Sequence, residues 1–176
     1  MNLKDKVVLV TGSGSGIGRK TSLVCAEYGA TVIALDINEE AAKLTEKMII
    51  DADGTAMAAK ADITDRVQVH TVIEDVIARF KKIDVLVNNA GSTRLGTMVD
   101  LEDSTYDFII NLNMKGPFIM STEVAKVMIP RRSGRIINIT SYCAVRGEFA
   151  NAPYCMAKAG IKMMTQVQAL ELGQYG

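Results

Sequence analysis

A glycine-rich stretch near the start of the chain has the composition of a phosphate-binding loop. It runs from Thr11 to Gly18 and reads Thr-Gly-Ser-Gly-Ser-Gly-Ile-Gly. The short branched run Val7 to Val10 precedes it, and apolar residues recur at helical spacing after it. A strand therefore leads into a helix N-terminus, where free backbone N–H groups and the positive end of the helix dipole favour an anion. Because glycine lets an anion approach the main chain closely, the stretch predicts a phosphate site.

Two well-known glycine motifs can be compared with this loop, and neither matches as written. A P-loop ends in Gly-Lys-Ser/Thr, whereas Gly18-Arg19-Lys20-Thr21 has one residue inserted, which displaces the lysine around the helix. The common dinucleotide fingerprint spaces its glycines two and then three positions apart, but Gly12, Gly16 and Gly18 are four and then two apart. Taken alone, the loop leaves a phosphate site and a purely structural turn both open.

An acidic residue stands at the end of the second predicted strand, Thr31 to Leu35. Asp36 follows the glycine loop by about 20 residues, where dinucleotide-binding sites place a carboxylate on the adenosine ribose hydroxyls. The same residue can instead be the acid before a helix over Asn38 to Met48. Because the glycine loop precedes it, we favour the ribose role.

A tyrosine and a lysine near the end of the chain are placed for proton transfer. Tyr154 and Lys158 are four residues apart in a predicted helix and share one face. Such a pair can exchange an alcohol proton while a hydride moves between a carbinol carbon and a nicotinamide. A free tyrosine has a pKa of about 10, and a nearby ammonium together with a positive nicotinamide favours the phenolate and lowers that pKa. The same spacing is also typical of a solvated helix face.

The elements that must position these residues alternate between strand and helix. Buried-strand patterns occupy Val7 to Val10, Thr31 to Leu35, Thr55 to Ala61, Ile83 to Val87 and Arg135 to Thr140. The alternation predicts one α/β domain over residues 1–176, a doubly wound parallel sheet of Rossmann type in three layers. Ligands of such sheets bind beyond the carboxyl ends of the strands. That edge is expected to hold Gly12, Asp36, Asp62 and Asn89.

Composition narrows the classes of partner and the location. With 48% hydrophobic residues and a net charge of zero, nothing favours nucleic acid, a membrane surface or a strongly charged partner. No apolar run approaches the ~20 residues that span a bilayer, and the N-terminus has no signal-peptide pattern, so we expect a cytoplasmic protein. Cys25, Cys143 and Cys155 lack metal-ligand spacing, which suits free thiols and predicts no metal site.

Taken in order, the motifs resemble those of a known family. They are Thr11 to Gly18, Asp62, Asn88 to Gly91, Asn113, Ser141, and Tyr154 with Lys158. From its first strand to its last residue, the chain is similar to short-chain dehydrogenases/reductases with the Thr-Gly-x-x-x-Gly-x-Gly loop. The resemblance implies an oxidoreductase that transfers a hydride between a nicotinamide cofactor and a small alcohol or carbonyl substrate.

The resemblance also implies catalytic roles. Tyr154 would be the acid/base, and Lys158 its electrostatic modifier, which also hydrogen-bonds the nicotinamide ribose. Ser141 would hold and polarise the substrate oxygen; it is preferred over Thr140 as the later residue of the family's Ser-Ser-like pair.

One asparagine completes the implied catalytic set. Asn113 would help position a water for proton relay, and it is preferred over Asn111 because Asn-Met-Lys-Gly matches the family's Asn-x-x-Gly. Taken with the resemblance, the cofactor-binding residues are expected to be Thr11, Gly12, Ser15, Gly16, Ile17, Gly18, Asp36, Ile37, Asp62, Ile63, Asn89, Ala90 and Gly91, with Tyr154 and Lys158.

The expected cofactor is NAD, with NADP the less favoured. A carboxylate at Asp36 would repel the 2′-phosphate of NADP, and Ser15 and Ile37 supply no compensating positive charge. Arg19 and Lys20 are the weak point of this argument, because either cation could meet that phosphate.

Substrate identity is weakly encoded. Ser92 to Leu95 and Tyr142 to Ala150 are expected to line the substrate pocket, and they include Arg94, Glu148 and Phe149. That mixture is compatible with sugars, polyols, hydroxy acids or 3-oxoacyl thioesters. The other class of function is a dinucleotide-binding module or partner subunit without turnover.

The chain ends at Gln174-Tyr175-Gly176, where the family normally continues into a sixth strand, a mobile segment over the substrate and a seventh strand. We expect either a fragment that lacks the C-terminal strands or a protein that works without that segment. The last helix has apolar residues on two stripes, and one stripe would pack against a neighbouring subunit of a homo-oligomer, a dimer or tetramer. Arg135 to Thr140 would present an unpaired edge, so the chain expressed alone is expected to be poorly soluble or inactive.

Overall fold

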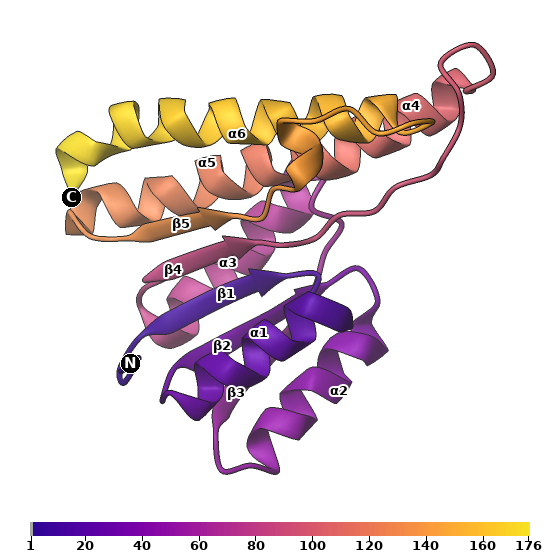
Figure 1. Ribbon diagram of the computed structural model, residues 1–176. Coiled ribbons are helices and arrows are strands. Elements are labelled where there is room, and N and C mark those ends of the chain that lie inside the picture. Colours follow the sequence, from indigo (N-terminus) through magenta and orange to yellow (C-terminus); the bar gives the residue numbers. More distant parts are fainter. Residues whose placement is uncertain (1) are drawn as a thin grey trace.

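Branched and other apolar residues form a parallel sheet at the centre of the molecule (Figure 1). In the computed structural model, which describes residues 2–176, the strands are β1 (Val7–Thr11), β2 (Thr31–Asp36), β3 (Thr55–Lys60), β4 (Val85–Asn88) and β5 (Arg135–Asn138). They pair in the order β3-β2-β1-β4-β5, with every pair parallel. The order reverses between β1 and β4, which is the point at which ligands bind in such sheets. The predicted doubly wound α/β sheet is confirmed.

Helices cover both faces and complete three layers (Figure 1). One face of the sheet is covered by α1 (Gly16–Glu27) and α2 (Glu39–Ile50). The other face is covered by α3 (Arg66–Phe80) and α5 (Gly116–Met128), whose buried residues pack on β1, β2 and β4. The long helix α6 (Ala152–Leu172) lies along α5.

Residues 103–128 form a helix with an internal change of pitch. α4 (Asp103–Ile110) passes into the π-helical turn η1 (Asn111–Lys115), which leads directly into α5. A short 3₁₀ turn, η2 (Ile129–Arg131), follows α5. The π turn matters for function because it changes which side chains face the sheet edge.

Several predicted strand boundaries are wrong by one or two residues. The fourth strand begins at Val85 rather than Ile83, and the fifth ends at Asn138 rather than Thr140. The third ends at Lys60 rather than Ala61. In the third and fourth strands the apolar pattern extends beyond the paired backbone, because the flanking residues Ala61 and Ile83 are also buried.

A buried carboxylate closes the end of the sheet opposite the strand carboxyl ends. Asp84, whose side chain is 8% exposed, accepts a hydrogen bond from the Val7 backbone N–H at 2.9 Å. Its two oxygens also meet Arg131 and Lys82, each at 3.0 Å. Arg131 donates in addition to the Ile83 carbonyl at 3.1 Å. One side chain therefore ties β1, β4 and the end of α5 together.

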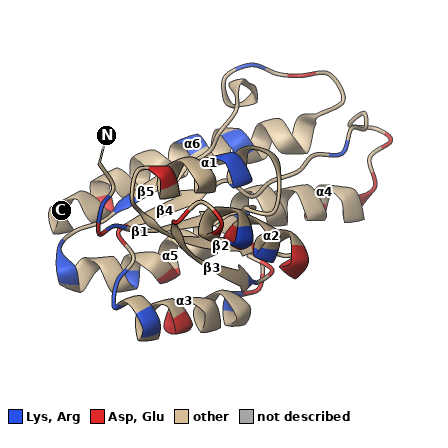
Figure 2. Cartoon of the chain, turned by 90° about the horizontal axis from the view of Figure 1, so that it is seen from below, with Lys and Arg blue, Asp and Glu red and all other residues tan. Residues whose placement is uncertain are grey.

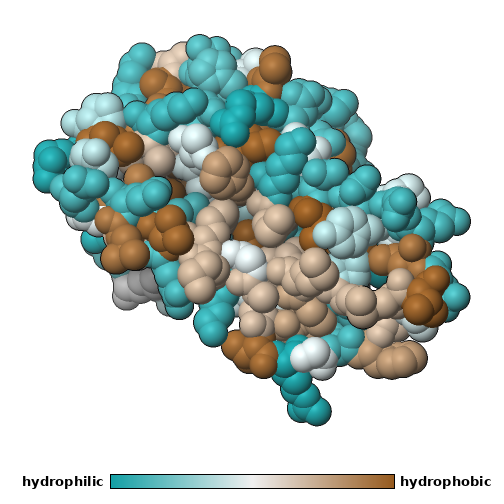
Figure 3. Space-filling model, turned by 90° about the horizontal axis from the view of Figure 1, so that it is seen from above, coloured by the Kyte–Doolittle hydropathy of each residue, from teal (hydrophilic) through white to brown (hydrophobic). Residues whose placement is uncertain are grey.

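The surface is mixed in charge and apolar in one region. Acidic and basic residues are interspersed over the outer helices (Figure 2). Seen from the side that carries α6, hydrophobic residues gather in one area (Figure 3). The exposed apolar residues of α6 are Met156, Met163, Val167 and Leu170. Among residues 2–176, no helix combines the length and the apolar character that crossing a bilayer demands.

Candidate active site

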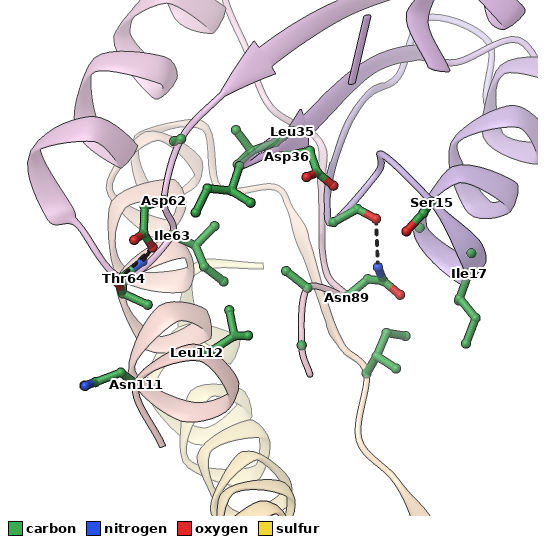
Figure 4. Close-up of a pocket in the computed structure, with 18 of the residues that line it drawn as sticks. Ser15, Ile17, Leu35, Asp36, Asp62, Ile63, Thr64, Asn89, Asn111 and Leu112 are labelled. Carbon is green, nitrogen blue, oxygen red and sulfur yellow. Dashed lines mark hydrogen bonds between the residues drawn. The ribbon is translucent and has the colours of Figure 1, made fainter. Parts of the chain in front are cut away.

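The carboxyl ends of the strands open onto one cleft of about 730 Å³ (Figure 4). Three regions of the chain form its walls: the glycine loop, the residues after β2, β3, β4 and β5, and the α4–α5 junction with the start of α6. Of the predicted site residues, the cleft is lined by Gly12, Ser15, Gly16, Ile17, Gly18, Asp36, Ile37, Asp62, Ile63, Asn89, Ala90, Gly91, Ser141, Tyr154 and Lys158. Segments up to about 140 residues apart in the sequence thus meet at the predicted edge.

The glycine loop forms a cradle that only small residues allow. A Cβ added to Gly18 would lie 2.0 Å from the Gly12 carbonyl oxygen, so no larger residue fits beneath the turn. A Cβ at Gly16 would meet nothing within 4 Å, because that residue, with φ of 50°, faces the open cleft. Ser15 is the N-cap of α1, yet its side chain makes no capping hydrogen bond. Backbone N–H groups and this hydroxyl suit a phosphate at the helix N-terminus.

The carboxylate of Asp36 is oriented by the loop itself. Its oxygens accept hydrogen bonds from the Gly14 N–H at 2.8 Å and the Asn38 N–H at 2.9 Å. In Figure 4 the carboxylate lies at one side of the cleft, facing the glycine loop. The helix cap considered as its alternative role belongs to Asn38, whose side chain accepts from the Ala41 N–H at 3.1 Å. Asp36 is therefore free to take hydroxyl donors from the cleft.

The Arg19 side chain, which weakened the argument for NAD, makes its hydrogen bonds outside the cleft. Arg19 donates through Nε to the Thr45 hydroxyl at 3.0 Å and through its guanidinium to the Gly14 carbonyl. Neither Arg19 nor Lys20 lines the cleft. Thr45 in turn donates to the Ser13 carbonyl at 2.7 Å, so the arginine joins the glycine loop to α2.

Thr11, predicted to bind cofactor, lies behind the cleft wall rather than in it. It is 1% exposed, and its hydroxyl accepts from the N–H groups of Asn89 and Ala90, each at 3.0 Å. The Asn89 side-chain amide donates to the Thr11 carbonyl at 2.9 Å. It also donates, more weakly, to the Gly12 carbonyl (Figure 4). Thr11 thus supports the wall that Asn89 and Ala90 form.

The residues after β3 form a compact turn. One carboxylate oxygen of Asp62 accepts from both the backbone N–H and the hydroxyl of Thr64, each at 2.8 Å (Figure 4). The turn presses Ile63 against Gly116, where an added Cβ would lie 2.6 Å from the Ile63 side chain. Asp62 therefore shapes the cleft wall as well as lining it.

The π turn buries Asn113 and leaves Asn111 at the cleft. Asn113 is fully buried, and its Nδ2 donates to the carbonyls of Ser92 at 2.7 Å and Ile109 at 2.9 Å. Within residues 2–176, its Oδ1 has no hydrogen-bond partner and faces Gly91. A buried, unpaired amide oxygen costs about 1–3 kcal/mol unless a water or ligand satisfies it. The Asn113 Oδ1 is thus available to accept a hydrogen bond from a water or ligand behind the cleft wall.

Lys158 and Tyr154 enter the cleft from successive turns of α6. The Lys158 side chain is buried, and its Nζ donates to the Ile139 carbonyl at 2.9 Å. That nitrogen lies 5.5 Å from the centre of the Tyr154 ring. An added Cβ at Gly91 would lie 3.6 Å from the same Nζ and 2.6 Å from the Asn113 Oδ1, so the lysine and the buried asparagine converge on one point.

The predicted lowering of the tyrosine pKa is not produced by the chain's own groups. Burial raises the pKa of Tyr154, the Ser141 side chain opposes this, and nearby Cys143 and Glu148 add to it. Burial also lowers the pKa of Lys158. The Lys158 ammonium is directed at the Ile139 carbonyl, and burial of the phenol is the largest influence on the pKa of Tyr154.

Ser141 follows β5 and faces the same space as the tyrosine. Its Oγ accepts from the Cys143 N–H at 3.2 Å and caps the short 3₁₀ turn η3 (Tyr142–Ala144). Thr140, the alternative residue, also lines the cleft but donates its hydroxyl to the Lys158 carbonyl at 3.0 Å. The geometry thus leaves the Ser141 O–H proton available to a substrate oxygen.

The sequence predicts only part of the cleft lining. Lining residues not predicted are Leu35, Ala61, Thr64, Phe108, Asn111, Leu112, Ile139 and Thr140. Leu35 and Ile139 could have been found from their places at strand ends, but Phe108 and Leu112 depend on the π turn. None of 92–95 or 142–150 lines this cleft. Residues 92–95 form an exposed loop, in which Arg94 stacks 4.2 Å from the centre of the Phe108 ring. Residues 142–150 begin with η3, whose Cys143 is buried. Their role as substrate-pocket segments stays a prediction.

Comparison with known proteins agrees with this architecture. The sequence profile of the family described as short chain dehydrogenase matches residues 6–176. The chain is 40% identical to a 3-oxoacyl-[acyl-carrier-protein] reductase of Thermotoga maritima, over 98% of this chain and 70% of that protein. It is 38% identical to a galactitol 2-dehydrogenase of Agrobacterium fabrum, over 100% of this chain and 68% of that protein.

Solved structures are similarly close. An NAD⁺-bound xylitol dehydrogenase superposes with a TM-score of 0.97 at 32% identity, over 100% of this chain and 68% of that one. A gluconate 5-dehydrogenase of Burkholderia cenocepacia, in complex with NADP and tartrate, gives a TM-score of 0.96 at 34% identity, over 99% and 69% of the two chains. The chain therefore spans about 70% of the length of the proteins that it matches.

Proposed function

This chain belongs to the short-chain dehydrogenase/reductase family, and we propose that it is an NAD-dependent oxidoreductase that interconverts an alcohol and a ketone. One observation carries the proposal: the glycine cradle, Asp36 and the pair Tyr154 and Lys158 all line a single cleft. A bound nicotinamide cofactor supplies the hydride acceptor and donor. The chain's own residues bind the cofactor, orient the substrate and exchange the proton.

The cofactor-binding roles follow from what each residue offers. The loop from Gly12 to Gly18 offers N–H groups and the Ser15 hydroxyl to a pyrophosphate. Asp36 offers carboxylate oxygens to ribose hydroxyls. The walls at Asp62 to Ile63 and Asn89 to Gly91 enclose the space between these two ends.

The proton is exchanged by the chain itself. The Tyr154 hydroxyl gives a proton to the carbonyl oxygen during reduction and takes it back during oxidation, while Ser141 holds that oxygen. Lys158 raises the positive potential around the phenol, and the Asn113 Oδ1 accepts a hydrogen bond from a relay water. This assignment of Asn113 rests on its unpaired oxygen facing Gly91.

The proposed substrates are sugars, polyols or 3-oxoacyl thioesters. Two similar proteins are described as a 3-oxoacyl-[acyl-carrier-protein] reductase and a galactitol 2-dehydrogenase, which represent two of these classes. The test follows cofactor absorbance with a panel of polyols, sugars, secondary alcohols and 3-oxoacyl thioesters in both directions. Turnover with at least one compound is expected, and binding of NAD without turnover on any of them would favour a cofactor-binding module instead.

NAD is expected to bind at least about 10-fold more tightly than NADP, which corresponds to roughly 1.4 kcal/mol. The Asp36 carboxylate repels a 2′-phosphate, and Arg19 is held by Thr45 and Gly14 rather than directed into the cleft. Replacing Asp36 by alanine is expected to weaken NAD binding and raise the NADP-to-NAD affinity ratio. Calorimetric titration of both cofactors measures the ratio.

The control for the cofactor prediction is a nearby carboxylate outside the cleft. Glu39 begins α2 and pairs with Lys43 at 2.8 Å. Replacing Glu39 by alanine is expected to leave the affinity ratio unchanged. Tighter binding of NADP than of NAD by the unaltered protein would show that Asp36 does not set the preference.

We further propose that the α6 surface is a contact between copies of this chain. The α6 residues Met156, Met163, Val167 and Leu170 are between 42% and 82% exposed. Figure 3, which shows the side that carries α6, has hydrophobic residues gathered in one area. Replacing Met163 by glutamate is expected to convert a dimer or tetramer into monomer, because a charge in an apolar contact is costly to desolvate. Light scattering after size exclusion measures the mass. A monomeric unaltered protein contradicts the proposal.

A further inference from the structure

The carboxylate of Glu148 gathers three donors in the segment between β5 and α6. Asn151 Nδ2 donates to its Oε2 at 2.6 Å, and the Cys143 thiol donates to the same oxygen at 3.3 Å. The Tyr142 hydroxyl donates to Oε1 at 3.2 Å. These hydrogen bonds, that from Asn151 first, hold the pKa of Glu148 below its usual range. Because the residue is exposed, the donors rather than packing fix the carboxylate.

Asn151 precedes α6 but does not use its side chain as a helix cap. Asparagine at this position ordinarily accepts from a backbone N–H of the first helical turn. Here no such bond is made. Instead its amide joins two loops, with Nδ2 donating to Glu148 and Oδ1 accepting from the Thr93 hydroxyl at 2.6 Å. Asn151 itself is 3% exposed, and both hydrogen bonds are partly buried.

A backbone hydrogen bond also joins the loop after β4 to the residues before α6. Ala150 has φ of 57°, in the left-handed region that non-glycine residues seldom adopt. Its carbonyl accepts from the Gly96 N–H at 2.8 Å, which fixes the loop after β4 to the start of α6. Backbone strain of this kind persists only where surrounding contacts hold it, and it clusters at active sites.

These contacts meet at the segments that carry two of the proposed catalytic residues. Ser141 directly precedes the turn that contains Tyr142 and Cys143, and its Oγ accepts the Cys143 N–H. Tyr154 lies three residues after Asn151 on α6. We infer that Glu148 is a positioning residue whose carboxylate joins the Ser141 turn to the first turn of α6 and so sets the distance between Ser141 and Tyr154. The inference rests on the dehydrogenase function proposed above.

The main test compares two replacements of Glu148. Glu148→Ala removes every acceptor and is expected to lower kcat about 10-fold, because small displacements of reacting groups reduce rate steeply. KM for the alcohol and Kd for NAD are expected to change by less than about twofold, since neither ligand is proposed to touch Glu148. Glu148→Gln keeps an amide oxygen for Asn151 and is expected to restore most of kcat. The matched control is Glu171→Ala, which removes an exposed carboxylate near the end of α6.

Asn151 supplies an independent check on the same contact. If Glu148 acts through Asn151, Asn151→Ala lowers kcat to a similar extent, and the double replacement is little worse than either single one. Full additivity of the two losses would mean that the residues act separately, and it would overturn the inference. So would a rise in KM with kcat unchanged, which indicates direct contact with substrate, or a Gln variant as slow as the Ala variant.

A readout without turnover separates this inference from the proposed function. The Cys143 and Gly96 amides are held at either side of Glu148, by the Ser141 side chain and the Ala150 carbonyl. Hydrogen exchange of both amides is expected to be faster in Glu148→Ala than in Glu171→Ala. If the protein binds NAD but turns over no substrate, the proposed function fails while this exchange still tests the contact. Unchanged exchange in Glu148→Ala rejects the positioning role in either case.

Discussion

Replacing Tyr154 by phenylalanine is expected to lower kcat by about 10²–10⁴-fold, the range that general acid–base catalysis contributes. The hydroxyl is the only group removed, and no other phenol lines the cleft within residues 2–176. The ring that packs beside the cofactor space is retained, so NAD affinity is expected to stay within about twofold of the unaltered protein. Steady-state kinetics and calorimetric titration measure the two quantities.

The matched control is Tyr175→Phe, which removes a hydroxyl far from the cleft and is expected to leave kcat unchanged. Lys158→Ala should reduce both kcat and NAD affinity, because the ammonium is proposed to serve phenol and ribose alike. If Tyr154→Phe kept most of its turnover, Tyr154 would be excluded as the acid/base.

The raised pKa of Tyr154 gives the pH dependence a definite sign. Burial favours the protonated phenol, so at neutral pH the residue is an acid rather than a base in the chain alone. Reduction of a ketone, which needs the proton, is expected to proceed across neutral pH and fall as pH rises through the raised pKa. Oxidation, which needs the phenolate, is expected to rise over the same range. The opposite slopes disappear in Tyr154→Phe.

Replacing Asp84 by alanine is expected to lower the free energy of unfolding by about 3 kcal/mol, the cost of breaking a buried charged hydrogen-bond network. The carboxylate accepts from the Val7 N–H, Arg131 and Lys82, and its loss removes the acceptor that all three share at the base of the sheet. Urea denaturation followed by circular dichroism measures the change. Asp75→Ala removes an exposed carboxylate from α3 and is expected to change stability by less than about 0.5 kcal/mol.

The same carboxylate predicts how the loss depends on pH. Burial raises the pKa of Asp84, but bonds from Val7, Arg131 and Lys82 outweigh it and hold the pKa below its usual range. Its contribution is therefore fully present above the unfolded pKa of about 3.9 and is lost as pH falls through the folded value. The difference in free energy of unfolding between the unaltered protein and Asp84→Ala should be constant between about pH 5 and pH 7. It should become smaller as the pH falls below that range. An equal gap at all pH values would exclude an ionic role.

The sequence was sufficient for the sheet and for most of the cleft. Branched apolar runs such as Val7 to Val10 indicate strands that are buried on both faces of a sheet. The carboxyl ends of parallel strands must also meet at one edge of that sheet. Glycines and an acid at fixed places along that edge then predict a nucleotide site. Asp36 and Tyr154, far apart in the chain, line one cleft for this reason.

The missed features depend on contacts that have no local signal. A π turn at Asn111 to Lys115 decides that Asn113 is buried while Asn111 lines the cleft, and helical periodicity assumes a constant pitch. The engagement of Arg19 by Thr45 requires that α1 and α2 be packed side by side. The pKa of Tyr154 depends on burial, which a spacing of four residues from Lys158 does not reveal.

The position of β1 at the centre of the sheet has a consequence for synthesis. Its sequence, Val-Val-Leu-Val-Thr, is buried throughout, with β2 on one side and β4 on the other. The second partner arrives late, since the Val7 N–H bonds to Asp84, 77 residues further along the chain. At about 5–20 residues per second, a ribosome needs on the order of 4 to 15 s to make that stretch. Throughout this interval at least one edge of the most apolar strand is unpaired, and an unpaired apolar edge is a template for pairing with another chain.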